Sequence, residues 1–159
     1  MGDTPLTVAL VAPAVVRPLR HAVLRPGWPD EDSIYPGDDD ALTAHAAVTE
    51  ADGGSVIAVG SILPEPAPWA PDIPAWRIRG MATDDRYRSQ GRGSLVLTAL
   101  GDHVRRNGGG LVWCNARIKA LPFYERAGFE GRDEVFELPG IGAHRRMWRT
   151  FEVWEPEGS

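Results

Sequence analysis

A glycine-rich turn between an apolar strand and an amphipathic helix is the feature that most restricts how this chain can fold. Residues 75–83 have the composition of a strand, and residues 91–106 carry leucine and valine at helical spacing. The turn at residues 88–93 reads Arg-Ser-Gln-Gly-Arg-Gly. Glycines let the backbone approach a ligand, and the start of a helix offers unpaired N–H groups to an anion. The turn therefore indicates either a pyrophosphate site or only a tight strand-to-helix connection.

Two other nucleotide-binding motifs fit this sequence poorly. A Walker-type phosphate loop needs Gly-Lys-Ser/Thr, and the single lysine, Lys119, follows Ile118. A dinucleotide fingerprint needs a third glycine three positions after Gly93, where Val96 stands. An NAD-dependent reductase is therefore the weaker alternative for the turn.

The other predicted elements give a mixed α/β order with more consecutive strands than a doubly wound fold has. A first helix ends near Pro26, and a short helix lies between Pro122 and Gly128. A hairpin turn is predicted at Ala51–Gly54. The remaining strands are predicted at Thr7–Val11, Thr43–Val48, Ser55–Leu63, Leu111–Asn115, Val135–Leu138 and Arg145–Trp154.

Two segments are predicted to be irregular excursions from these elements. Residues 64–74 contain five prolines, which exclude a regular helix or a central strand. Residues 27–40 carry six aspartates and glutamates, and a solvated loop is the more common form of such a charge run. A cationic amine could also be attracted to it.

Size, charge and residue counts restrict the function further. The 159 residues fit one domain, 1–159. A net charge of −5 argues against a nucleic-acid partner, and one cysteine excludes an internal disulfide. Four scattered histidines lack metal-ligand spacing, so no metal is expected. The early apolar run Thr7–Val16 is interrupted by Arg17, which favours a cytoplasmic protein with no membrane segment.

The turn and its lead-in strand resemble the GCN5-related N-acetyltransferases (GNAT). The signature of that family is Arg/Gln-x-x-Gly-x-Gly/Ala after a strand, and Arg88, Gly91 and Gly93 fill its fixed places. The resemblance spans about Leu19 to Met147. It implies a mixed, mostly antiparallel sheet of six to seven strands, flanked by about four helices, with a cleft where the fourth and fifth strands separate. It also implies direct transfer of an acetyl group from acetyl-CoA to a primary amine.

The resemblance assigns two groups of residues to the cofactor. The fourth strand of the family pairs with the pantetheine arm, and the turn after it holds the pyrophosphate. The residues at these positions are Met81, Ala82 and Thr83 for the arm, and Arg88, Ser89, Gln90, Gly91, Arg92, Gly93 and Ser94 for the pyrophosphate.

Residues 111–129 resemble the second half of the same site. They match the fifth strand of the family and a short helix that carries Phe-Tyr-x-x-x-Gly-Phe. Asn115 matches an asparagine that contacts the pantetheine region, and Phe123 and Tyr124 fill the aromatic positions beside the cofactor. A phenol near the cofactor sulfur can protonate the leaving thiolate, a role that we favour for Tyr124 over a core aromatic. Cys114 is interpreted as a buried small hydrophobe rather than a nucleophile.

A base must accept the proton of the attacking amine. Residues 138–147 resemble a subgroup of the family in which a histidine faces the acceptor pocket, so His144 is the first candidate and His45 the second. Either histidine could instead be structural. The acceptor is expected to be a small-molecule or peptide amine whose identity the sequence leaves open. An acyl-CoA sensor without transfer activity, a longer acyl donor and a homodimer also stay open.

Overall fold

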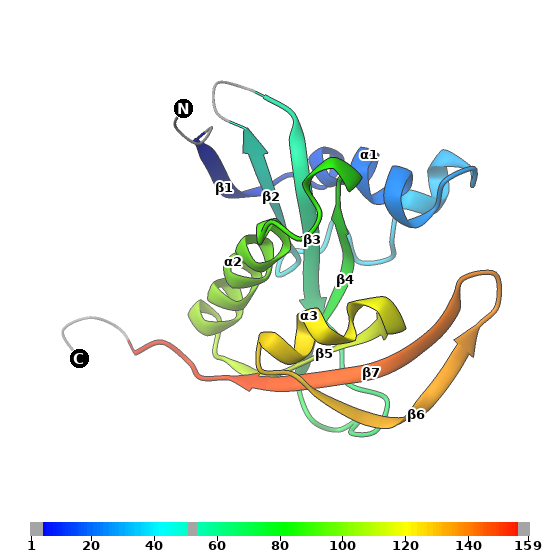
Figure 1. Cartoon of the computed structure of the whole chain (residues 1–159). Helices are drawn as coiled ribbons and strands as arrows, with labels where there is room; N and C mark the ends of the chain where they lie inside the picture. Colours follow the sequence, from blue (N-terminus) through cyan, green and yellow to red (C-terminus); the bar gives the residue numbers. More distant parts are fainter. Residues whose placement is uncertain (1–4, 51–53, 156–159) are drawn as a thin grey trace. The chain divides into compact units, whose positions relative to one another are not determined.

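The computed structural model describes residues 5–50 and 54–155, and within them it contains three α-helices, three 3-10 helices and seven strands. The strands form one sheet in the order β1-β2-β3-β4-β5-β7-β6 (Figure 1). Their bounds are β1 Leu6–Val11, β2 Ala44–Glu50, β3 Val56–Pro64, β4 Ala75–Thr83, β5 Gly110–Arg117, β6 Glu130–Leu138 and β7 Gly142–Phe151. The helices are α1 Pro13–Leu24, η1 Asp30–Ser33, η2 Asp85–Tyr87, α2 Arg92–Arg106, η3 Ile118–Ala120 and α3 Leu121–Arg126.

The predicted fold class is confirmed, with three α-helices where about four were expected. Antiparallel ladders join β1 to β2, β2 to β3, β5 to β7 and β6 to β7. A parallel ladder joins Ala75–Arg77 of β4 to Leu111–Trp113 of β5. The pairing of the predicted hairpin is confirmed, while residues 51–53 of its turn lie outside the described residues. The gap expected between the fourth and fifth strands stays a prediction.

The strand β6 is longer than the sequence indicated. The prediction began at Val135, whereas β6 begins at Glu130. The first six residues of β6 are all exposed, so they lack the apolar alternation that marks a half-buried strand. Pairing with β7 therefore defines this strand, and its own composition does not.

The described chain forms two compact units. The first comprises the residues up to 63 and residues 80–103, and the second comprises residues 64–79 and the residues from 104 onward. The chain passes from one unit to the other within β4, after Arg79, and within α2, after His103. The single domain expected for residues 1–159 stays a prediction.

In the first unit, α1 and α2 cover opposite faces of the strands. Val16 of α1 packs in one cluster with Val59 of β3. A Cβ atom at the next residue, Gly60, would come within 2.8 Å of Val96 in α2. Successive strand residues point to opposite faces, so β3 is sandwiched between the two helices. Gly60 lets α2 approach more closely than a side chain would allow.

In the second unit, α3 and the proline-rich segment cover opposite faces of β5. The Trp113 ring packs with Ala67 and Ala75, and its Nε1 donates a hydrogen bond of 2.9 Å to the carbonyl of Glu65. On the α3 face, the rings of Tyr124 and Phe129 lie 5.4 Å apart. Residues 64–74, which were predicted to be irregular, therefore cover an apolar cluster. This packing explains why the segment follows a fixed path without regular secondary structure.

Candidate functional site

The turn before α2 has the backbone conformation of an anion site. Ser89 and Gly91 adopt positive φ angles of 64° and 79°. A Cβ atom at Gly91 would meet no atom within 4 Å. Turns with such left-handed residues direct successive N–H groups into one concavity, and the first N–H groups of α2 lack intrahelical acceptors. Residues 88–94 therefore have the backbone features that an anion site needs, and the pyrophosphate role that the resemblance implies for them stays a prediction.

Two arginines add positive charge to this turn. Arg88 Nη2 lies 2.7 Å from Asp85 Oδ1, and both side chains are largely exposed. Exposed ion pairs contribute little free energy, so Arg88 can exchange Asp85 for a phosphate oxygen readily. Arg92 Nη1 donates to the carbonyl of Gln90 at 2.9 Å, and its Nε is buried without an acceptor among the described residues.

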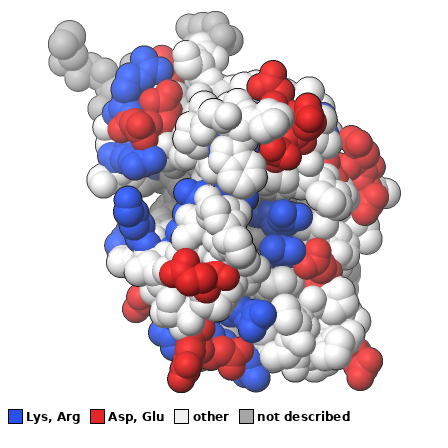
Figure 2. Space-filling view, turned by 90° about the vertical axis from the view of Figure 1, so that its right-hand side faces the viewer, with Lys and Arg blue, Asp and Glu red and all other residues white. Residues whose placement is uncertain are grey.

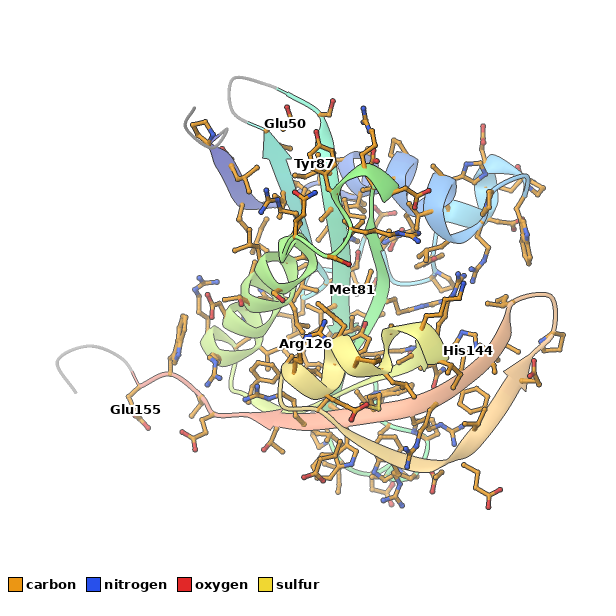
Figure 3. All side chains as sticks on the ribbon, in the orientation of Figure 1. Glu50, Met81, Tyr87, Arg126, His144 and Glu155 are labelled. Atoms are coloured by element: carbon orange, nitrogen blue, oxygen red, sulfur yellow. The ribbon has the colours of Figure 1, made fainter. Side chains whose placement is uncertain are left out.

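Contacts upstream of the turn tie it to β2 and β3, and sequence reasoning missed them. The N–H of Asp84 donates to the carbonyl of Ile57 at 2.8 Å, and the Asp84 carboxylate accepts from the N–H of Arg86 at 3.0 Å. The Tyr87 hydroxyl donates to Glu50, and the two side chains point toward one another in Figure 3. This hydrogen bond raises the pKa of Tyr87 above its usual value. In the sequence, only Asp84 indicated these contacts, because aspartate is favoured at the capping position of such turns.

The predicted pantetheine residues Met81, Ala82 and Thr83 follow a glycine of left-handed backbone within β4. Gly80 has a φ angle of 66°, and a Cβ atom there would come within 2.8 Å of Arg20 Nε. Beyond it, Ala82 packs in the same cluster as Val16, whereas Met81 faces Gly60. A positive φ angle inside a strand favours glycine, and the close approach of Arg20 leaves no room for a side chain at Gly80.

Tyr124 is a buried phenol, with 4% of its surface exposed, and its hydroxyl is hydrogen-bonded to the Cys114 thiol. Burial, and then the neighbouring Cys114, raise the pKa of Tyr124 well above its usual value. The phenol therefore keeps its proton at neutral pH, as a proton donor must. Burial also raises the pKa of Cys114 to about 12. The predicted burial of Cys114 is confirmed, and its lack of reactivity stays a prediction.

The structure brings Phe123 close to Tyr124 but places Asn115 on the other face of β5. The rings of Phe123 and Tyr124 lie 5.0 Å apart. Because Tyr124 contacts Cys114, the next residue, Asn115, points away from α3. Asn115 pairs in register with Arg146 of β7, and its Oδ1 is buried without a donor among the described residues.

His45 has both ring nitrogens engaged within the first unit. Arg20 Nη2 donates to Ser61 Oγ at 2.8 Å, and Ser61 Oγ lies 2.6 Å from His45 Nδ1. His45 Nε2 donates to the carbonyl of Asp38 at 2.9 Å, because a carbonyl can only accept. In the neutral ring the lone pair is therefore on Nδ1, where the Ser61 hydroxyl donates to it.

His144 has the opposite hydrogen-bond pattern. Its Nδ1 donates to the carbonyl of Gly142 at 2.8 Å, which leaves the lone pair of the neutral ring on Nε2. The ring is 4% exposed and lies 6.0 Å from the ring of Phe136 at a tilt of 30°. Figure 3 shows His144 on β7 in the second unit.

The acidic segment 27–40 is not wholly solvated, which corrects the expectation for it. Asp38 is buried, and it accepts from Arg20 Nη1 at 2.8 Å and from the N–H of Tyr35 at 3.1 Å. Burial raises the pKa of Asp38, but these hydrogen bonds and the charge of Arg20 outweigh it and leave the pKa below its usual value. The sequence shows the run of acidic residues, but it does not show that Arg20, the basic partner of Asp38, lies on another element.

Charges of both signs are interspersed on the face drawn in Figure 2, unlike the basic face of a nucleic-acid binder. Within residues 5–50 and 54–155, no group of three or more His, Cys, Asp and Glu side chains is arranged to hold a metal ion. In the same described ranges, every helix is too short or too polar to cross a membrane.

The chain matches a family profile and a relative in sequence, and it matches solved structures in fold. The acetyltransferase (GNAT) family profile matches residues 15–129. The Bacillus subtilis (strain 168) protein named uncharacterized N-acetyltransferase YitI is 34% identical over 135 residues, which are 85% of this chain and 89% of that protein. The crystal structure of Escherichia coli ElaA matches with a TM-score of 0.72 at 20% identity, covering 91% of this chain and 99% of ElaA. A chain in the crystal structure of the NatC complex bound to Gag peptide and CoA matches with a TM-score of 0.72 at 15% identity, covering 91% of this chain and 98% of that one.

Proposed function

Because the chain belongs to the acetyltransferase (GNAT) family and is an acetyltransferase, we propose that it moves an acetyl group from acetyl-CoA to a primary amine by direct attack. The turn at residues 88–94 is the observation that carries this proposal, since its left-handed residues and the start of α2 fit a pyrophosphate. The NatC structure, which contains CoA, supports CoA as the carrier. A small-molecule or peptide amine is the proposed acceptor.

Acetyl-CoA supplies the acetyl group as an activated thioester. In the first unit, the N–H groups of residues 89–94 with Arg88 and Arg92 would hold its pyrophosphate, and residues 81–83 would line its pantetheine arm. In the second unit, Asn115 and Phe123 are assigned to the same molecule by resemblance. Holding the donor and the amine together supplies much of the acceleration expected of such an enzyme.

We assign the general base to His144 rather than to His45. A base needs a lone pair that can receive the proton. Ser61 occupies the lone pair of His45, whereas the hydrogen bond from His144 Nδ1 to Gly142 leaves Nε2 to accept. In this scheme His144 takes the amine proton at Nε2, and Tyr124 gives its phenolic proton to the sulfur that leaves. The buried hydroxyl of Tyr124 is protonated at neutral pH, which that role requires.

The proposal is tested by incubating the protein with acetyl-CoA and a pooled amine library while free thiol and acetylated masses are recorded together. We expect thiol release with one dominant acetylated product. Tyr124→Phe should slow turnover by about 10²-fold or more while acetyl-CoA still binds, as measured by calorimetry. Binding of acetyl-CoA without any product would favour the sensor alternative, and failure to bind acetyl-CoA would refute the proposal.

A further inference from the structure

Arginine and aromatic side chains alternate along one face of β6 and β7 in the second unit. Arg146 of β7 stands opposite Arg132 of β6, and His144 stands opposite Phe136. Residues directly opposite in a sheet point to the same face, and so do residues two apart on one strand. Arg132, Arg146, Phe136 and His144 therefore share one face. α3 packs on the other, through Tyr124 and Cys114.

Aromatic rings hold both guanidinium groups in place. Arg146 Cζ lies 5.2 Å from the ring centroid of Phe136, and Arg132 Cζ lies 4.9 Å from that of Trp69. Such stacking fixes the plane of a guanidinium while its N–H groups stay available at the edge. The side chains of Arg132 and Arg146 are 42% and 32% exposed, so a solute can reach both.

The positive charge of this pair is only partly neutralised. Asp133 Oδ2 lies 3.5 Å from Arg132 Nε and 3.7 Å from Arg146 Nη1, so one carboxylate serves two guanidinium groups without a short hydrogen bond to either. Arg146 Nε is buried with no acceptor among the described residues. The pair therefore keeps about one unit of positive charge and unused donors, in a chain whose net charge is −5.

We propose that Arg132 and Arg146 bind an anionic group, a carboxylate or a phosphate, on the amine acceptor. Guanidinium groups recognise both anions through paired N–H donors. The inference rests on the proposed function, which places the amine of the acceptor at its base, His144. His144 lies two residues before Arg146 on β7. Two residues of a strand span about 6.6 Å, so the acceptor carries its amine and its anion on a short carbon chain.

The test compares two matched pairs of amines in ligand-observed NMR titrations of the full chain. One pair is 4-aminobutyrate and its amide, and the other is 2-aminoethyl phosphate and ethanolamine. We expect the anionic member of at least one pair to bind about tenfold more tightly than its neutral counterpart. Arg146→Gln and Arg132→Gln should each abolish that preference. Arg126→Gln should retain it, because exposed Arg126 lies on α3 (Figure 3) and its loss changes the net charge equally.

Equal binding of charged and neutral members by the wild type would overturn the inference, and so would an unchanged preference in both arginine variants. The pair that shows the preference identifies the anion as carboxylate or phosphate. Thiol release from acetyl-CoA is measured on the same samples. Absence of release with an intact preference would refute the proposed transfer and leave the anion site standing. If Arg146→Gln does not fold, the more exposed Arg132→Gln decides the matter.

Discussion

At the scale of single residues, hydrogen-bond polarity separates two histidines that look alike in the sequence. His144→Gln is expected to lower kcat/KM by about 10²-fold or more, because the amine loses its proton acceptor. His45→Gln is expected instead to lower the free energy of unfolding by about 1–3 kcal/mol, because Ser61 and the carbonyl of Asp38 lose their partner in a buried network. Thiol-release kinetics and urea unfolding of both variants measure the two effects.

The pH dependence of kcat/KM is the control for the two histidine variants. A histidine base must be neutral to accept a proton, so the wild-type kcat/KM should fall as the solution is acidified, and that fall should be absent in His144→Gln. Loss of activity in His45→Gln beyond its loss of folded protein, with His144→Gln fully active, would reverse the assignment.

Cys114 offers a second test at this scale. A thiol whose pKa is raised to about 12 is ionised to only about one part in 10⁴ at pH 8, and the thiolate is the reactive form. The native protein should therefore react negligibly with a disulfide reagent such as DTNB at pH 8, and one equivalent should react in guanidinium chloride. Rapid labelling of the native protein would contradict the buried contact between Cys114 and Tyr124.

At the scale of elements, an ion pair attaches the acidic segment to α1. The pKa of Asp38 is lowered in the folded state, so its stabilising contribution is complete above the unfolded value of about 3.9 and is lost as the pH falls through the folded value. Asp38→Asn should lower the free energy of unfolding by about 2–4 kcal/mol at pH 7, because Arg20 is left without its charged partner. Urea unfolding should show the difference shrinking as the pH falls below about 4.

Asp39→Asn is the matched control for this element. Asp39 is exposed and adjacent, so removal of its charge should change the free energy of unfolding by less than about 0.5 kcal/mol. Equal losses in the two variants would mean that the pair between Arg20 and Asp38 does not attach the segment.

At the scale of the whole molecule, ligand binding should stabilise the fold. A ligand at 100 times its Kd adds about 2.7 kcal/mol, which raises the Tm of a chain of this size by about 5–10 °C. Saturating acetyl-CoA should give such a shift in a thermal melt, and NADH should give none. Gly91→Val should reduce the shift, since a β-branched residue strains the positive φ angle of the turn without a clash in the folded chain. A shift with NADH alone would favour the reductase.

Local rules were enough to predict most of the helices and strands and the turn before α2. Apolar periodicity predicted α2 and most strands, and the glycine pattern predicted the turn at residues 88–93, because these features depend on neighbours a few positions apart. The polar strand β6 was missed in its first half for the same reason, since only its pairing with β7 defines it. The roles assigned to Tyr124 and Asn115 came from resemblance and stay predictions.

Partners distant in the sequence were decided by the tertiary structure alone. Arg20 and Ser61 are 41 positions apart, yet they are hydrogen-bonded, and Ser61 Oγ in turn contacts His45 Nδ1. The shared face of Arg132 and Arg146 follows from strand register, which shifts between Arg132 and Phe136. The sequence by itself thus determined which segments become strand, turn and helix. Only the tertiary structure decided which lone pairs and charges remain free for chemistry, because hydrogen bonds and ion pairs form between whatever side chains the fold brings together.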